Sequence, residues 1–268
     1  FYTASTMGNV YRRLVYTSIM SLLGEEKVSD YSFVELGAEG GQDFFEGMDV
    51  AFAGTSAVGW NDSIELEGKL VVFSNELLDA QPFRRFIYTD GQWCELGVKA
   101  DQGSLSEIRM DEVAIPDFFP RESTEGYRID WSSGAEALLE LIVCKDWSGR
   151  LLFFDYGKNW DDIIHAMPAG TARTYQRHEL GTDLLSDPGK RDITCHVCWD
   201  RLEAILNKGG FTKTELLPQE RFFLKYGMAT IESIASNPDP MVSEKRKLME
   251  LLHPVHMGAK FQAFTSTR

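Results

Sequence analysis

The sequence predicts an α/β fold, in which a mostly parallel sheet is covered by helices on both faces and carries some antiparallel strands. Strand-like and helix-like segments alternate along the chain, which is the order typical of parallel sheets. Leu70 to Phe73 form a continuous apolar run, as expected of a strand that is buried on both faces. A turn at Asp90-Gly91 separates strand-like segments at 83–88 and 93–98, and this pattern predicts a hairpin.

Apolar residues with helical spacing predict the helices. The first helix carries Val10, Leu14 and Ile19 on one face. Gly209-Gly210 is a pair suited to a C-cap, so the third predicted helix ends there. The predicted helices cover residues 9–23, 134–144, 199–208, 219–236 and 243–252.

Short apolar runs bounded by turn residues or acids predict the strands. The run at 33–37 leads into a Gly-rich turn, and the run at 150–155 ends in an acid. The predicted strands cover residues 33–37, 49–54, 69–74, 83–88, 93–98, 150–155, 192–197 and 211–217.

The length of 268 residues suits one large domain, and we expect residues 1–268 to form it. Residues 99–128 are acidic, contain proline and lack a clear period, which predicts an irregular insertion. Residues 160–189 are rich in glycine and proline and predict a loop-rich segment.

The composition is that of a globular protein, with 43% hydrophobic and 25% charged residues. The formal net charge of −14 argues against a general nucleic-acid binder, because phosphate contacts require clustered Lys and Arg. An acidic chain does suit a cationic partner, such as a protein segment that carries Arg or Lys. The sequence does not predict an oligomeric state.

The sequence favours a cytoplasmic location. No apolar run approaches the ~18 residues that a membrane span requires, and no signal-peptide pattern is visible. Four cysteines in a chain of this size fit a reducing compartment. The chain begins at Phe1 without a Met, so a preceding targeting segment, and with it a mitochondrial location, stays open.

A polar cluster directly follows the strand at 69–74. Asn75, Glu76 and Asp79 would stand at the carboxyl end of that strand, where open α/β sheets bind their ligands. The same residues also suit the start of a short helix, with Asn75 as the N-cap and the two acids in the first turn. Both interpretations remain open at this point.

The Gly-rich turn at 35–41 (ELGAEGG) is expected to lie between a strand and a helix. Glycines at such a turn let the backbone approach a ligand and leave N–H groups free. The dinucleotide pattern G-x-G-x-x-G is not satisfied, because Glu39 occupies its middle position. No acid follows about 20 residues later, so an NAD-dependent enzyme is disfavoured.

The segment 192–198 offers two further interpretations. Cys195 and Cys198 have metal-ligand spacing, but residues three apart on a strand point to opposite faces, so we expect buried thiols and no metal site. The same periodicity places Asp192, Thr194 and His196 on one face. This polar row either faces a substrate channel or holds His196 as a structural, hydrogen-bonded residue.

Several blocks, in order along the chain, resemble the MidA family of class I S-adenosylmethionine-dependent methyltransferases. The family includes a mitochondrial complex I assembly factor that methylates an arginine. The blocks are FYT at 1–3, ELGAEGG at 35–41, NELLDAQP at 75–82, DYG at 155–157, GTARTYQRH at 170–178, DITCHV at 192–197 and a looser set from Gln219 to Gly227.

This resemblance implies a Rossmann-like class I methyltransferase fold, S-adenosylmethionine as cofactor, and methyl transfer to a protein side chain, with arginine as a candidate acceptor. The implied cofactor-binding residues are Glu35, Gly37, Gly41 and Asn75. The implied catalytic residues are Glu76, Asp79, Asp155 and His196. Carboxylates among them would orient an acceptor guanidinium and balance its charge.

Two departures from the family pattern concern the cofactor side. Glu39 stands where the family has a second glycine, and its carboxylate would repel the carboxylate of the cofactor. Residues 42–68 show neither the long helix nor the ribose-binding acid of the family. An alternative is therefore a non-catalytic relative that has lost cofactor binding and binds a protein partner.

Overall fold

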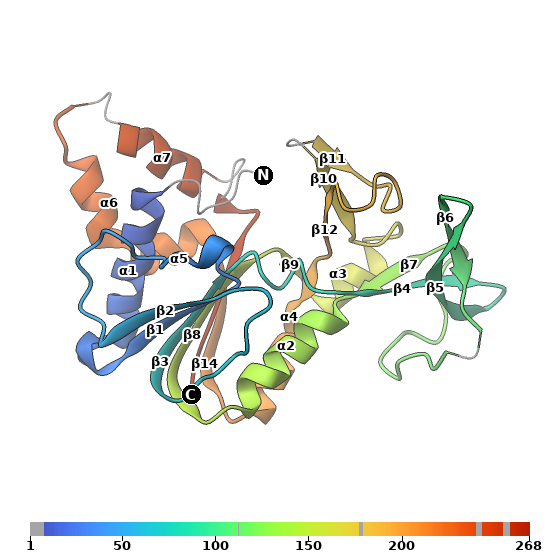
Figure 1. The fold of residues 1–268 in the computed structure, drawn as a ribbon, viewed down its shortest axis with the longest axis horizontal. Helices are drawn as coiled ribbons and strands as arrows, with labels where there is room; N and C mark the ends of the chain where they lie inside the picture. Colours follow the sequence, from blue (N-terminus) through green and yellow to red (C-terminus); the bar gives the residue numbers. More distant parts are fainter. Residues whose placement is uncertain (1–7, 112, 177–178, 240–242, 254–257) are drawn as a thin grey trace. The chain divides into compact units, whose positions relative to one another are not determined.

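The computed structural model describes residues 8–111, 113–176, 179–239, 243–253 and 258–268, without the side chains of Glu39, Gln176 and Glu179. The chain forms two compact units (Figure 1). We call the first the α/β unit; it contains the described residues up to 77, together with 141–156 and those from 206 onward. The second, the β-rich unit, contains residues 78–140 and 157–205.

The α/β unit is built on a six-stranded sheet with the order β14-β15-β8-β3-β1-β2. Strands β2, β1, β3 and β8 run parallel to one another, and β15 is antiparallel to both of its neighbours. The strands are β1 (Ser32–Leu36), β2 (Gly54–Val58), β3 (Gly68–Asn75), β8 (Trp147–Asp155), β14 (Thr212–Pro218) and β15 (Gln262–Thr267).

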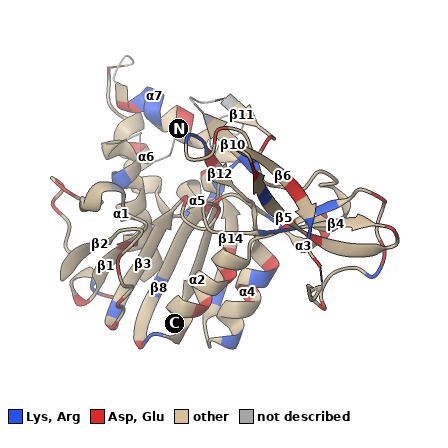
Figure 2. Cartoon of the chain, turned by 45° about the vertical axis from the view of Figure 1, so that its right-hand side comes forward, with Lys and Arg blue, Asp and Glu red and all other residues tan. Residues whose placement is uncertain are grey.

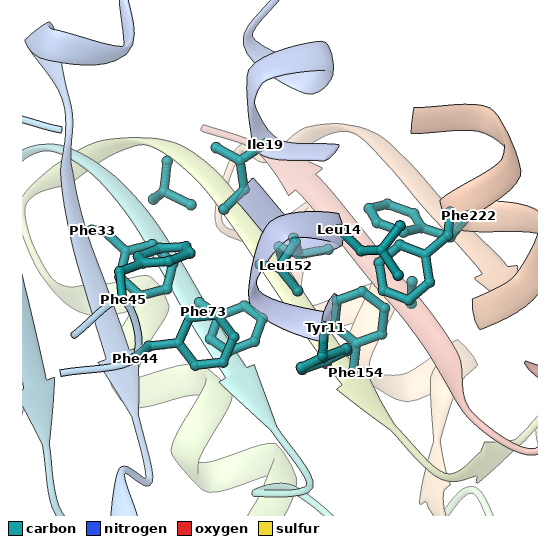
Figure 3. Packing of buried hydrophobic residues seen from close by; sticks show 14 of the residues in the cluster. Tyr11, Leu14, Ile19, Phe33, Phe44, Phe45, Phe73, Leu152, Phe154 and Phe222 are labelled. Carbon is teal, nitrogen blue, oxygen red and sulfur yellow. The ribbon is translucent and has the colours of Figure 1, made fainter. Parts of the chain in front are cut away.

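The two central strands are buried on both faces, which explains their continuous apolar sequences. Val71 and Phe73 of β3 lie in the same hydrophobic cluster as Leu152 and Phe154 of β8 (Figure 3). Their neighbours along each strand point to the opposite face and are buried as well. A strand that is apolar on both faces is stable only where both faces are covered, which is the centre of such a sheet.

Four helices cover the face that carries this cluster (Figure 1). The apolar stripe of α1 supplies Leu14 and Ile19, and α5 supplies Phe222, whose rings and methyl groups fill the space above the sheet (Figure 3). The helices are α1 (Asn9–Leu23), α5 (Gln219–Tyr226), α6 (Met228–Ala235) and α7 (Ser243–Leu252).

Two further helices, α2 (Ser133–Cys144) and α4 (Trp199–Lys208), begin in the β-rich unit and end in the α/β unit. Their last turns supply buried Ile142 and Leu206 to the α/β unit. Trp147 at the start of β8 donates its indole N–H to the carbonyl of Ile142 at 2.9 Å.

The β-rich unit holds a four-stranded antiparallel sheet of order β6-β5-β4-β7 and two smaller sheets, β11-β10-β12 and β13-β9. A second hydrophobic cluster, around Phe86, Trp93 and Phe119, packs on the larger sheet. The elements are β4 (Arg84–Thr89), β5 (Gln92–Asp101), β6 (Ser104–Arg109), β7 (Arg128–Trp131), β9 (Gly157–Lys158), α3 (Trp160–His165), β10 (Arg173–Gln176), β11 (Glu179–Gly181), β12 (Asp192–Thr194) and β13 (Val197–Cys198).

The mixed, mostly parallel sheet and the predicted hairpin are confirmed, and the predicted helices agree closely with α1, α2, α4 and α7. The segments expected to be irregular contain some regular structure. Residues 99–128 include the end of β5 and all of β6, and residues 160–189 include α3, β10 and β11 between loops. One predicted helix is wrong in its extent. The predicted helix 219–236 is divided at Gly227 into two helices, 219–226 and 228–235. A Cβ at position 227 would lie 3.0 Å from the Phe223 carbonyl oxygen, so the close packing at this break favours glycine.

Over the described part of the chain, no helix is both long enough and apolar enough to cross a membrane.

Candidate functional site

Polar residues from three neighbouring strands meet at the carboxyl edge of the α/β unit. In the register of the sheet, Leu36 of β1 is paired with Ser74 of β3, and Asn75 of β3 is paired with Phe154 of β8. Asn75 and Asp155 therefore differ by one residue in level, and Glu35, which is paired with Phe73, lies two residues below Asn75. Asp155 is the last residue of β8 and is fully buried.

A chain of hydrogen bonds connects helix α1 to this edge. The Tyr11 hydroxyl donates to Asn75 Oδ1 at 2.6 Å, and Asn75 Nδ2 donates to Glu76 Oε1 at 3.0 Å. Burial, together with the negative charges of Glu76 and Glu35, raises the pKa of Tyr11 well above its usual range. Tyr11 is thus a neutral donor that fixes the orientation of the Asn75 amide.

Tyr11 was not among the predicted site residues. It lies on the same apolar stripe as Leu14 and Val15, and by sequence alone it looks like part of the core. A buried tyrosine usually finds a partner for its hydroxyl, and that rule is the signal that could have identified it.

Glu76 holds an unusual backbone conformation at the end of β3. Its φ is 54°, in the left-handed region that non-glycine residues seldom adopt, while its N–H still donates to the Phe154 carbonyl at 2.9 Å. Local strain of this kind tends to occur at functional sites. No helix begins after Asn75, so the alternative that Asn75 is an N-cap is wrong.

The Gly-rich turn differs from the expected turn with free N–H groups. The amides of Gly37 and Ala38 both donate to the Val58 carbonyl, at 2.8 and 3.1 Å, so they are not available to a ligand. A Cβ on Gly37 would lie 2.7 Å from Leu77 Cδ1, which gives this glycine a packing role. A Cβ on Gly41 would meet nothing within 4 Å, so this end of the turn is open. The side chain of Glu39 lies outside the described residues.

The segment after the turn contains no α-helix over residues 42–68, as the absence of a helical pattern there predicted. The three-residue 3-10 helix η3 (Glu39–Gly41) is followed by a coil in which Phe44 and Phe45 are buried. Their rings lie 4.7 Å from those of Phe73 and Phe33, respectively (Figure 3). These aromatic side chains thus fill the core where a helix would otherwise pack.

Asp79 and His196 both belong to the β-rich unit. Asp79 is buried, and its backbone carbonyl accepts a hydrogen bond from Cys195 N at 2.8 Å, so these two blocks meet within that unit. Strand β12 ends at Thr194, and His196 lies between β12 and β13. The predicted row of Asp192, Thr194 and His196 on one strand face is therefore wrong.

The surroundings of His196 disfavour a positive charge. Burial, followed by the charges of Lys158 and Arg173, lowers the pKa of His196 to about 4. Its Nδ1 atom is buried and has no hydrogen-bond partner in the described part of the chain. The imidazole is thus neutral at pH 7. The expectation of a structural, hydrogen-bonded histidine is not met at its Nδ1 atom.

This low pKa predicts a pH-dependent stability. The unfolded chain takes up the proton near pH 6.5 and the folded chain only near pH 4, so stability is full above the first value and falls below it. Between pH 7 and 5, the free energy of unfolding should fall by roughly 2 kcal/mol more in the wild type than in His196→Asn. Chemical denaturation at both pH values measures this difference. His165 is exposed, so His165→Asn should show the same fall in unfolding free energy between pH 7 and 5 as the wild type. If both variants reduced this fall equally, the low pKa of His196 would not be its cause.

Cys195 and Cys198 are both buried and free. Burial raises the pKa of Cys198 to about 12 and that of Cys195 further, so both are neutral thiols at pH 7. The strand argument that separated them does not hold, because Cys195 lies outside β12 and β13. Among the described residues, no three His, Cys, Asp or Glu side chains are grouped to hold a metal ion.

The carboxyl edge of the α/β unit fits the cationic parts and the hydroxyl groups of S-adenosylmethionine. Glu35 and Glu76 are half-buried acceptors, and Asn75 is an oriented amide between Tyr11 and Glu76. The open side of Gly41 allows a close approach of ligand to backbone. No α-helix begins directly after the Gly-rich turn, so residues 42–53 supply no helix N-terminus of the kind that commonly receives an anionic group.

Comparison with known families identifies the family of this chain. Residues 42–216 match the model of a family described as "Putative S-adenosyl-L-methionine-dependent methyltransferase". Because the match covers more than half of the sequence, the chain belongs to this family. The match confirms the predicted class of methyltransferase and its cofactor, and it begins directly after the Gly-rich turn. No curated protein sequence matches the chain significantly.

Two solved structures share the whole fold. One is an uncharacterized ACR protein from Burkholderia thailandensis, with a TM-score of 0.82 and 21% identity over 99% of this chain and 81% of that chain. The other, described as a "likely methyl transferase" from the same organism bound to S-adenosyl-homocysteine, has a TM-score of 0.82 and 20% identity over 100% of this chain and 79% of that chain. The similarity confirms the Rossmann-like methyltransferase fold.

Proposed function

We propose that this chain binds S-adenosylmethionine at the carboxyl edge of the α/β unit and methylates a protein side chain, with arginine as the acceptor. The observation that carries the proposal is the set of three carboxylates at adjoining strand ends: Glu35 on β1, Glu76 after β3 and Asp155 on β8. Carboxylates on neighbouring strands favour cations, and both the sulfonium of the cofactor and an arginine guanidinium are cationic.

In this proposal the protein acts mainly by positioning. S-adenosylmethionine supplies, when bound, a methyl group that is already activated on its sulfonium. Glu76 accepts N–H bonds from the acceptor guanidinium and fixes its plane, since carboxylates and guanidinium groups match in geometry. Tyr11 and Asn75 hold Glu76 in place, and the rigid ends of β3 and β8 limit its movement.

Glu35 and Asn75 serve the cofactor side in this proposal. A carboxylate at the end of β1 can accept from an ammonium or from hydroxyl groups, and the oriented Asn75 amide offers a neutral partner. The roles of Asp79 and His196, which lie in the β-rich unit, stay predictions from the family resemblance.

Calorimetric titration of the full chain with S-adenosylmethionine and with S-adenosyl-homocysteine tests the cofactor site. We expect saturable binding with a Kd well below 1 mM, and a loss of affinity of about tenfold, or about 1.4 kcal/mol, in Glu35→Gln. Glu67→Gln is a matched control, because Glu67 is exposed and lies at the opposite end of β3.

The same titration also decides the alternative of a non-catalytic, partner-binding relative. Two observations support that alternative. The amides of Gly37 and Ala38 are already hydrogen-bonded to the Val58 carbonyl, and residues 42–53 form no helix. If neither compound binds below millimolar concentration while the chain is folded, the enzyme proposal fails and the alternative is favoured.

A further inference from the structure

The β-rich unit contains a cavity of about 510 Å³ that no feature of the proposed methyltransferase site explains. This volume lies within the range of small-molecule sites. Three arginines line it, Arg85, Arg128 and Arg173, in an otherwise acidic protein. Figure 2 shows Lys and Arg segments beside Asp and Glu segments along the strands of this unit. The remaining lining includes the apolar Pro168 and Ala172 and the hydroxyl-bearing Thr182.

A buried carboxylate behind the cavity holds two of its lining residues, Arg85 and Ala172. Asp130 is 1% exposed, and its two oxygens accept from Arg85 Nε at 2.6 Å and Arg85 Nη2 at 3.0 Å. Asp130 Oδ2 also accepts from the backbone N–H groups of Thr171 and Ala172, at 2.7 and 2.8 Å. Gly170 has a φ of 74°, and a Cβ there would lie 2.2 Å from the same oxygen, so only glycine fits. The arginine and the loop are thus held rigidly.

The three guanidinium groups differ in how their charge is balanced. Arg85 is neutralised by Asp130 and also contacts Glu107 at 3.2 Å. Arg128 uses its Nη1 for both Glu107 oxygens, at 2.8 and 3.0 Å. Two carboxylates therefore face three guanidinium groups, which leaves an excess of one positive charge at the cavity.

Arg173 carries that excess. Its Nη1 donates to the carbonyls of Gly170 and Ala172, at 3.1 and 2.7 Å, and no carboxylate pairs with it among the residues that the structure describes. These bonds fix the guanidinium through Nη1 and do not involve Nε or Nη2. The edge formed by Nε and Nη2 can bind a carboxylate or phosphate in bidentate fashion.

We propose that this cavity binds a small organic anion, whose carboxylate or phosphate group is held by Arg173 and Arg128 and whose apolar body lies against Pro168 and Ala172. The cations and the bidentate edge select the oxyanion. The apolar lining and the volume, which is larger than an inorganic anion needs, select a ligand with a carbon skeleton.

The test uses nuclear magnetic resonance on the full ¹⁵N-labelled chain, with benzoate, phenyl phosphate and benzamide as probes. Benzamide matches benzoate in shape without its charge. We expect saturable shifts of the Ala169 and Ala172 amide signals with benzoate, phenyl phosphate or both, and the stronger of the two identifies the preferred oxyanion. Benzamide should give no saturable shift at the same concentrations.

Variants of Arg173 complete the test. Arg173→Gln should weaken binding at least about tenfold, and Arg173→Lys, which keeps the charge without the bidentate edge, should weaken it less. Arg121→Gln removes an exposed arginine of the same unit and should change affinity less than about twofold. If Arg173→Gln does not fold, as its amide spectrum will show, Arg128→Gln takes its place.

Three results would overturn the proposal. Benzamide binding as tightly as benzoate would show an apolar cavity without anion selectivity. An equal loss in Arg121→Gln and in the cavity variant would show only a general effect of charge. The absence of saturable shifts with both anions up to about 50 mM would mean that the cavity is no anion site.

Discussion

Replacing Asp130 by asparagine should lower the free energy of unfolding by about 3–5 kcal/mol. The native carboxylate is buried and accepts four hydrogen bonds, two from Arg85 and two from the backbone of residues 171 and 172. Asparagine keeps the shape but turns an NH₂ group toward donors, so at least one donor loses its partner. It also removes the principal counter-charge of Arg85, whose side chain is only 11% exposed.

Urea denaturation of the full chain, followed by circular dichroism, measures this loss. Hydrogen exchange of the Thr171 and Ala172 amides gives a local readout, because both should lose protection first. Asp187→Asn is the matched control: it breaks another aspartate–arginine pair, with Arg191, in which the aspartate is exposed, and such a pair contributes about 0–1 kcal/mol. A loss in Asp130→Asn no larger than in this control would refute the structural role of Asp130.

The fold was largely predictable because its central strands are buried on both faces. Continuous apolar runs such as Val71–Phe73 and Leu151–Phe154 have one stable location, the middle of a covered sheet. The last strand, β15, was not predicted, because its sequence QAFTST mixes polar and apolar residues. Its position is fixed by pairing with β8 and β14, which are distant in sequence.

The candidate site was predictable where a residue follows directly from its strand. Glu35, Asn75 and Asp155 are strand-end residues, so predicting the strands also located them. Tyr11 and Asp130 could not be found in this way, because each acts through partners that tertiary packing brings together. The Gly-rich turn was misjudged for the same reason: whether an amide is free depends on its partner, and the Val58 carbonyl lies on another strand.

Replacing Glu76 by glutamine should reduce methyl transfer to an arginine acceptor by about 10²–10³-fold, which corresponds to roughly 3–4 kcal/mol. Glutamine has nearly the same size, so Asn75 Nδ2 keeps a possible acceptor in the amide oxygen. What disappears is the negative charge that would orient and neutralise the guanidinium, and a charged hydrogen bond is about twice as strong as a neutral one. The thermal midpoint should change little, because the strained backbone at φ 54° suits neither side chain better than the other.

A methyl-transfer assay with labelled S-adenosylmethionine and an arginine-containing acceptor provides the rate, and calorimetry with S-adenosyl-homocysteine provides the cofactor affinity. The rate should fall while the affinity changes less than about fivefold, since Glu76 acts on the acceptor in this proposal. Glu67→Gln, at the other end of β3, should leave both quantities unchanged. Activity within a few fold of the wild type would remove Glu76 from the catalytic residues. A parallel loss of rate and cofactor affinity would instead assign Glu76 to the cofactor side, together with Glu35 and Asn75.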